Sequence, residues 1–377
     1  MRKKSVSEKG LSGRNLLVYV EDPGAANLVL GLTEKLTSID CRVFIVASKS
    51  AQTLLSHHNE EFISFNSDLS ADHLLREYQP SLVACGTSED PETIGLSLIS
   101  AARRSGILTV GLVDAAMNER FRFRGKSEDP LFHRPEKILV TSRKSIERFV
   151  EIGVNRSDIF LFQNPAFLLA RQKRRVFDLR SRAQERGRIF GTGLAARKII
   201  CFLSERSDGL NPKDLKRSVE YTIRGRGQTR DRTKIVLEEL IECCKELSKE
   251  IRIVVCLHPQ EQPGDYLQYK KEVLILGGGV PSLEASFFSD LVVGLTTTLL
   301  EEVRVLGAPV LSIIPRELER NWVPFPITET SRIACSREEI KVQVSRVLGD
   351  ANERRRDQAL AMDQVPELVE LLILLMK

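Results

Sequence analysis

A helix start rich in threonine could hold a phosphate group in the second half of the chain. Residues 294–302 run from an apolar stretch into a helical pattern, and Thr296, Thr297 and Thr298 stand where that helix begins. Hydroxyl groups and free backbone N–H groups donate to an anion at such a point, and the helix dipole favours negative charge there. Glu302, one turn further along, could accept two hydrogen bonds from a ribose diol. The alternative for Glu302 is an ordinary carboxylate on a helix surface.

A histidine ends another apolar run in the same half. His258 precedes Pro259 and is the only histidine in the second half of the chain. A neutral imidazole at a strand end could hydrogen-bond a phosphate or a sugar hydroxyl. The alternative is a histidine whose ring is satisfied by a neighbouring carbonyl.

Acidic residues follow apolar runs in the first half. Asp22 precedes Pro23, so it could cap a helix that has proline at its first position. Asp22 or the adjacent Glu21 could instead act as a general base on an acceptor hydroxyl. Asp114, after the fifth run, is the stronger functional candidate, whereas Asp90 is explained as a helix cap before proline.

The elements that would position these side chains alternate regularly. Short apolar, β-branched runs are separated by turn residues and helical patterns, such as those over residues 93–104, 142–152, 233–249 and 298–306. The runs cover residues 16–20, 43–47, 62–65, 82–85, 108–113, 138–140, 159–162, 199–203, 251–257, 273–276, 291–293 and 310–314. This alternation predicts an α/β protein with two Rossmann-like domains in tandem, whose ligands bind outside the carboxyl ends of parallel strands.

Composition excludes several classes of protein. The chain has 377 residues, enough for two domains, with 42% hydrophobic and 28% charged residues, which excludes a disordered tail and a multi-span membrane protein. A net charge of +5 is too small for a dedicated nucleic-acid binder. The seven cysteines are scattered, and no apolar region follows the basic N-terminus, so we expect a cytoplasmic protein. The apolar residues 368–376 are too few to span a bilayer.

A basic segment joins the two predicted domains. Residues 171–198 hold ten lysines and arginines against two acidic residues. We expect a solvated linker helix; the alternative is a surface for anionic lipid or a phosphorylated acceptor. We expect residues 365–377, by contrast, to pack on the protein, because two glutamates interrupt their apolar pattern.

Several catalytic motifs are absent. The sequence has no G-x-G-x-x-G, no G-x-x-x-x-G-K-[ST], no H-E-x-x-H and no D-x-D. These absences disfavour a dehydrogenase, a P-loop enzyme, a zinc protease and a metal-dependent sugar transferase, so we predict no metal and no cofactor beyond a nucleotide-sugar co-substrate.

Together these features resemble the GT-B superfamily, which comprises two-Rossmann glycosyltransferases and UDP-N-acetylglucosamine 2-epimerases. The residues that carry the resemblance are Asn164-Pro165 with Gln163 in the place of a glycine, His258-Pro259, and Glu302 five residues before Gly307-Ala308-Pro309. In that family the glutamate at this spacing holds the nucleotide ribose, and the preceding helix start holds the diphosphate. The resemblance implies parallel sheets that face an interdomain cleft, and a C-terminal helix that returns to the first domain.

Two departures bear on the choice of activity. The epimerase motif Asp-Ser-Gly-Gly-x-x-Glu-Glu falls on residues 295–302, with leucine for the aspartate and threonine for the serine and both glycines. The epimerase His-Arg motif falls near Glu205 and Arg206, where no histidine stands. These departures disfavour epimerase chemistry and leave nucleotide-sugar binding as the expectation.

The resemblance therefore predicts a metal-independent glycosyltransferase that moves a sugar from a UDP- or CMP-linked donor to a cell-surface glycan or lipid-linked acceptor. Such an enzyme would be cytoplasmic, with peripheral contact at the inner face of an anionic membrane. The expected donor site comprises Glu205, Arg206, His258, Thr296, Thr297, Thr298 and Glu302, and the expected base is Asp22 or Asp114. The alternatives are an epimerase-like enzyme, which would change the sugar without an acceptor, and a non-catalytic GT-B protein that binds a nucleotide or a partner protein.

The predicted organisation has five parts. These are a flexible N-terminus (1–14), an acceptor-side domain (15–168), a basic linker (169–197), a nucleotide-sugar domain (198–349) and a C-terminal helix (350–377).

Overall fold

The computed structural model divides the chain into two compact units. The first unit comprises Met1–Ala166 and Met362–Lys377, and the second comprises Phe167–Ala361. The structure describes residues 13–66, 69–88, 90–206, 219–259, 261–276, 280–325, 331–349 and 365–377. The segment expected to be a linker thus belongs to the second unit.

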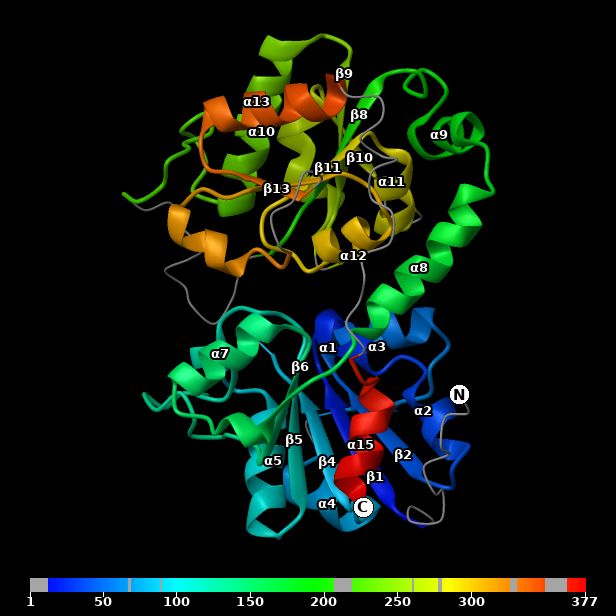
Figure 1. Cartoon of the computed structure of the whole chain (residues 1–377), viewed down its shortest axis with the longest axis vertical. Helices are drawn as coiled ribbons and strands as arrows, with labels where there is room; N and C mark the ends of the chain where they lie inside the picture. Colours follow the sequence, from blue (N-terminus) through cyan, green and yellow to red (C-terminus); the bar gives the residue numbers. More distant parts are fainter. Residues whose placement is uncertain are drawn as a thin grey trace. The chain divides into compact units, whose positions relative to one another are not determined.

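The first unit is built on a seven-stranded parallel sheet (Figure 1). Its strands are β1 Asn15–Val20, β2 Arg42–Ala47, β3 Ile63–Ser64, β4 Leu82–Gly86, β5 Leu108–Val113, β6 Lys137–Val140 and β7 Ile159–Leu161. They lie in the order β3-β2-β1-β4-β5-β6-β7. The strand order reverses between β1 and β4, and such a switch point is where doubly wound sheets bind ligands.

The second unit is built on a six-stranded parallel sheet. Its strands are β8 Lys198–Leu203, β9 Ile251–Cys256, β10 Val273–Leu276, β11 Leu291–Gly294, β12 Val310–Ile313 and β13 Ser331–Ala334. Their order, β10-β9-β8-β11-β12-β13, puts the switch point between β8 and β11.

All twelve apolar runs form strands, and the prediction of two parallel α/β sheets is confirmed. The sequence pattern missed β13, because a serine and an arginine occupy half of its four residues. Its place follows from parallel pairing with β12, in which Ser312 lies opposite Ile333.

Helices cover both faces of each sheet (Figure 1). In the first unit they are α1 Pro23–Leu28, α2 Leu32–Thr37, α3 Lys49–His57, α4 Ala71–Tyr78, α5 Ile94–Arg104, α6 Glu119–Arg122, α7 Arg143–Glu151, the 3₁₀ helix η2 Arg156–Asp158 and α15 Leu368–Met376. In the second unit they are α9 Arg182–Phe190, α10 Arg232–Leu247, α11 Ser282–Phe288, α12 Leu299–Val305, α13 Arg337–Gly349 and the 3₁₀ helices η4 Pro263–Tyr269 and η5 Glu317–Trp322. Helix α8, Pro165–Asp178, begins at the end of the first unit and continues into the second.

The C-terminal helix packs on the first unit. Leu368, Leu371, Leu372 and Met376 of α15 are buried in the cluster that covers one face of the seven-stranded sheet. Lys35 also forms an ion pair with Glu367 at 2.8 Å. The prediction that residues 365–377 pack on the protein and return to the first domain is confirmed.

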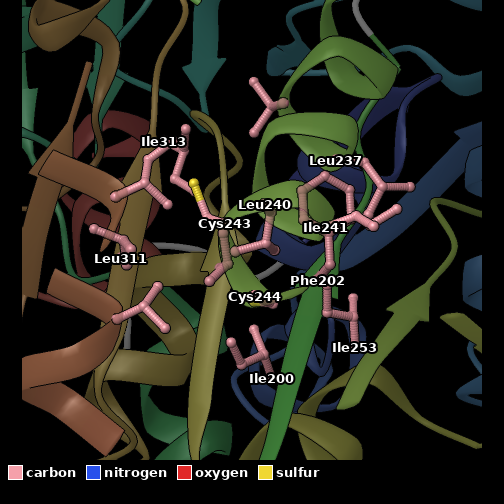
Figure 2. Close-up of a cluster of buried hydrophobic side chains, with 14 of the residues drawn as sticks. Ile200, Phe202, Leu237, Leu240, Ile241, Cys243, Cys244, Ile253, Leu311 and Ile313 are labelled. Atoms are coloured by element: carbon pink, nitrogen blue, oxygen red, sulfur yellow. The ribbon is translucent and has the colours of Figure 1, made fainter. Parts of the chain in front are cut away.

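The core of the second unit forms between its sheet and α10. Figure 2 shows Leu237, Leu240 and Ile241 of this helix above Ile200 and Phe202 of β8. The three α10 side chains recur at helical spacing, and the two β8 side chains alternate along the strand. Each set therefore lies on one face of its element, and the two faces pack together.

The basic segment is only partly solvated. Arg186 of α9 is only 6% exposed and pairs with Asp290 at 3.1 Å, and Arg182 pairs with the same carboxylate at 3.3 Å. Arg180 and Arg188 both pair with Glu284, at 2.5 and 2.7 Å. The expectation that residues 171–198 face solvent is therefore wrong for Arg186, which is buried against Asp290, whereas the side chain of Arg188 stays 51% exposed although it is paired.

Candidate functional site

The switch point of the second unit brings two predicted site residues into direct contact. Glu205 follows β8 and Thr296 follows β11, and both side chains are buried. The backbone N–H of Thr296 donates to Glu205 Oε2 at 2.9 Å, and the Thr296 hydroxyl donates to Oε1 at 3.0 Å. A carboxylate of the protein therefore already occupies the donors of Thr296, one of the three threonines that the sequence assigned to a diphosphate.

Buried charges extend from Glu205 across the carboxyl edge of the sheet. Arg232, at the start of α10, pairs with Glu205 and with Glu319, and Arg316 donates to the other oxygen of Glu319 at 2.8 Å. Burial alone would lower the pKa of Arg232, but the two carboxylates hold the pKa above its ordinary value. Arg316 also lies 5.4 Å from the ring centre of Trp322. Since every one of these charges has a partner, the network fixes the loops around the switch point.

Thr297 and Thr298 lie beside this network with more exposure. Both side chains are half-buried at the start of α12, and Thr298 is its N-cap residue without a side-chain capping bond. The N–H of Leu299 lies 3.3 Å from the Thr297 hydroxyl. These two threonines, rather than Thr296, are the hydroxyls of this helix start that could meet a ligand.

Glu302 stands out among the described carboxylates. It is half-buried on α12, and within the ranges that the structure describes no hydrogen bond or ion pair is formed by its side chain. Burial raises the pKa of Glu302 to about 7; Lys173 of α8 opposes the rise and Glu301 adds to it. A desolvated carboxylate without a protein donor can accept two hydrogen bonds from a vicinal diol.

His258 ends β9, beside the end of β8. Its backbone N–H donates to Ser204 Oγ at 2.8 Å and to Glu261 Oε2 at 3.0 Å. Burial lowers the pKa of its imidazole, Glu261 and Glu205 oppose this, and Arg206 adds to it. Arg206 is therefore near the ring, and a neutral imidazole next to an exposed guanidinium suits phosphate or sugar oxygens.

Asp114 lies against the loop after β1, at a point two residues along the chain from Asp22. Asp22 is the N-cap residue of α1 and Pro23 opens the helix, but the Asp22 side chain makes no capping bond. Asp114, after β5, contacts the backbone of Gly24 so closely that any Cβ at position 24 would collide with its carboxylate. Glycine at position 24 is required for this approach.

Asp114 has a buried oxygen that forms an ion pair but, within the described ranges, no hydrogen bond. Its Oδ1 is buried and has no hydrogen-bond partner among the described residues, and Arg122 Nη1 lies 3.6 Å away. Arg122 is itself buried and instead donates to Thr87 Oγ1 at 3.1 Å. A buried carboxylate oxygen that has a counter-ion but no described hydrogen-bond donor makes Asp114 a candidate functional residue.

Glu21, the alternative base, is fully engaged. It accepts hydrogen bonds from the hydroxyls of Tyr19 at 2.8 Å, Thr93 at 2.5 Å and Ser88 at 3.2 Å, and pairs with Lys49 at 2.6 Å. With four donors its lone pairs are occupied, so Glu21 is a structural residue of the switch point.

The expectation for Asp90 needs a correction. Thr93, not Asp90, caps α5 by accepting from the N–H of Gly95 at 3.3 Å. Asp90 accepts from the N–H of Glu92 at 2.8 Å and pairs with Lys49 at 2.5 Å.

Sequence reasoning missed Arg232, Arg316, Glu319 and Glu261. Each of these residues lies in a polar stretch whose sequence is typical of an exposed loop. Their roles depend on long-range contacts such as that between Arg232 and Glu319, which the sequence does not show. Within the described ranges no three His, Cys, Asp or Glu side chains are grouped as metal ligands, and no helix there is long and apolar enough to cross a bilayer.

Comparisons with known proteins agree on the fold. No protein-family model matches the sequence, and no curated protein matches it significantly. The structure is similar to the UDP-GlcNAc 2-epimerase of Methanocaldococcus jannaschii in complex with UDP-GlcNAc and UDP, with a TM-score of 0.65, 12% identity, and coverage of 96% of this chain and 99% of that one.

Two further structures are also similar. The UDP-GlcNAc 2-epimerase of Neisseria meningitidis bound to UDP-GlcNAc gives a TM-score of 0.64 at 11% identity, over 96% of this chain and 98% of that one. Anabaena Alr3699/HepE in complex with UDP-glucose gives 0.61 at 13% identity, over 90% and 91% of the two chains. The chain therefore has the fold of the UDP-GlcNAc 2-epimerases, with two Rossmann-like halves of the GT-B type.

Proposed function

We propose that this protein is an enzyme that binds a UDP-linked sugar through its second unit. Glu302 accepts the ribose diol, Thr297 and Thr298 donate to the diphosphate, and His258 and Arg206 hold phosphate or sugar oxygens. The observation that carries the proposal is the state of Glu302, a desolvated carboxylate with a pKa of about 7 and no hydrogen-bond donor in the described structure. Glu205 and Thr296 are not in this ligand set, because they bind each other.

The reaction that we favour is epimerisation at C2 of the sugar. Inversion at C2 requires that the C2–H bond breaks while its electron pair expels UDP from C1, and that a proton and UDP then add back with the opposite configuration at C2. The site therefore needs groups that accept and return a proton and groups that keep UDP bound. Asp114 and Asp22 are our candidates, and the buried Oδ1 of Asp114, which pairs with Arg122 at 3.6 Å and accepts no hydrogen bond in the described structure, supports the role of Asp114. The fold shared with UDP-GlcNAc 2-epimerases over 96% of the chain also supports this reaction.

Glycosyl transfer is the second candidate. The threonines that replace the glycines of the epimerase motif favour it, as does similarity to the Anabaena protein, another structure of which holds UDP and glucose. In this case Asp22 or Asp114 would deprotonate a glycan or lipid-linked acceptor, and Thr297, Thr298 and Arg206 would stabilise the departing UDP.

Incubation with UDP-GlcNAc in the absence of an acceptor, followed by proton NMR, separates these activities. Epimerisation produces the C2-epimeric UDP-sugar without net release of UDP. Transfer leaves the sugar unchanged until an acceptor is added, and UDP then appears. Asp114→Asn should abolish conversion while UDP binding persists; full activity of a folded D114N variant would contradict the role of Asp114.

A binding screen addresses the non-catalytic alternative. UDP or UDP-GlcNAc at 100 times its Kd should stabilise the protein by about 2.7 kcal/mol in thermal unfolding. Stabilisation without turnover of any donor would indicate a binding protein, and no stabilisation by any nucleotide would refute the proposed site.

A further inference from the structure

Glu261 joins the ends of two neighbouring strands in the second unit. Its Oε2 accepts from the hydroxyl of Ser204, which follows β8, and from the N–H of His258, which follows β9, at 3.0 Å. Its Oε1 accepts from the hydroxyl of Tyr266 in η4 at 2.8 Å. One carboxylate therefore ties three segments together at the carboxyl edge of the sheet.

These contacts constrain both residues that we assign to phosphate or sugar oxygens. His258 N–H is shared between Glu261 and Ser204 Oγ, so the backbone at the end of β9 is fixed on both sides. Ser204 is buried and lies two residues before Arg206, so its hydrogen bonds also fix the chain that leads to the guanidinium. Tyr266 is completely buried and gives the carboxylate a rigid support.

The charge of Glu261 also acts on the imidazole. Three charged groups among the described residues influence His258: Glu261 and Glu205 favour the protonated ring, and Arg206 disfavours it. Glu205 is neutralised by Arg232, whereas the hydrogen bonds that Glu261 accepts from Ser204, His258 and Tyr266 all come from uncharged donors.

We propose that Glu261 is a positioning residue of the nucleotide-sugar site, which holds His258 beside Arg206 so that the two can bind one phosphate group. This inference rests on the proposed function for its ligand. The effect of Glu261 on the titration of His258 is independent of the proposed function and can be measured in the protein without ligand.

The test combines NMR titration of the histidine ring with UDP titration in three variants. The chain has five histidines, so the His258 signal can be assigned by its loss in His258→Gln. Glu261→Gln removes the charge at nearly constant shape, and Tyr266→Phe removes one anchor and keeps the charge. Asp265→Asn is the matched control, because Asp265 caps η4 through the N–H of Gln262 at 2.9 Å.

We expect E261Q to move the His258 titration to lower pH and to weaken UDP binding roughly tenfold, since a charge-assisted hydrogen bond contributes about 1.5 kcal/mol or more. Y266F should weaken UDP binding by less, and D265N should change neither quantity. Y266F decides the question if E261Q does not fold, because an unchanged UDP affinity in Y266F would then overturn the proposal.

An unchanged His258 titration and unchanged UDP affinity in folded E261Q would also overturn it. If the wild-type protein binds no UDP, the proposed function fails separately. In that case a lower His258 pKa in E261Q, with none in D265N, would still support the positioning of His258 by Glu261.

Discussion

At the scale of single residues, Glu302 differs from the other buried carboxylates of the second unit. Glu205 and Glu319 are ion-paired, and each stabilises the loops around it. Glu302 has no such partner in the described structure and lies close to Lys173. A carboxylate that costs folding energy without a compensating bond is expected where a ligand supplies the donors.

Substitution of Glu302 by alanine should weaken UDP binding about tenfold or more, because two hydrogen bonds to the ribose diol are lost. Isothermal titration measures the change. Glu301→Gln is the control, since Glu301 lies on the same turn and pairs with Arg304 at 3.7 Å. Equal UDP affinity in E302A and the wild type would remove Glu302 from the site.

The raised pKa of Glu302 also predicts a pH dependence of stability. A carboxyl group with a folded pKa of about 7 and an ordinary value of 4.5 binds its proton more tightly in the folded state. Its contribution to stability is fully present below pH 4.5 and is lost as the pH rises through 7, by an amount on the order of 3 kcal/mol.

Urea unfolding between pH 5 and pH 8 should therefore show a fall in the free energy of unfolding that is smaller in Glu302→Gln. Identical profiles for the two proteins would mean that the Glu302 carboxyl has an ordinary pKa.

At the scale of elements, the C-terminal helix α15 packs on a sheet whose strands lie far from it in the sequence. Leu372 is completely buried in the cluster that includes β1, whereas Leu374 of the same helix is 60% exposed. Substitutions at these two leucines therefore test the buried face and the exposed face of the same helix separately.

Leu372→Ala should lower the free energy of unfolding by about 2–5 kcal/mol, because it leaves a cavity against the sheet. Leu374→Ala should change it by less than about 0.5 kcal/mol. Chemical denaturation followed by circular dichroism gives both values. Equal losses in the two variants would show that α15 is not held through Leu372.

The basic helices α8 and α9 also differ in the extent to which their arginines are paired with acidic side chains. The four arginines from 180 to 188 are paired on the second unit, whereas Arg175 and Leu179 of the preceding segment are exposed. Any contact with an anionic membrane would therefore belong to the end of α8.

Flotation with anionic vesicles should show weak association that decreases as salt rises. Arg175→Gln should reduce binding about fivefold, since one basic residue near the surface contributes about 1 kcal/mol. Arg188→Gln removes the same charge from a site paired with Glu185 and Glu284, and should have little effect. Association that does not respond to salt would contradict an electrostatic contact.

At the scale of the whole molecule, the proposed site residues are divided between two units, each with its own core. The nucleotide-binding candidates belong to the second unit, and the proton-transfer candidates belong to the first. Each group lies at the carboxyl ends of parallel strands, and Asp22 lies at the β1 side of the switch point of its own sheet.

Activity on a UDP-sugar should survive chelation. The sequence has no D-x-D pair, so hydroxyls, helix dipoles and arginines are left to stabilise the diphosphate. Conversion of UDP-GlcNAc should continue at an unchanged rate in EDTA. Loss of activity that magnesium or manganese restores would contradict this arrangement.

The sequence by itself determined the elements and indicated one candidate side chain. Local β-branched runs were sufficient to predict β1 to β12, since strands buried on both faces are continuous apolar stretches. The apolar pattern of α15 predicted its docking. The resemblance at the spacing of Glu302 from Gly307 made Glu302 a candidate ribose ligand, which stays a prediction.

Only the tertiary structure decided how the polar side chains are used. Glu205 bonds to Thr296 although 91 positions separate them, and Arg186 meets Asp290 across 104 positions. No local pattern encodes such pairs, because a charged residue has the same neighbours in sequence whether it faces water or a buried partner. The pairing depends on which strand ends the sheet order brings together, and that order is fixed by packing of the whole unit.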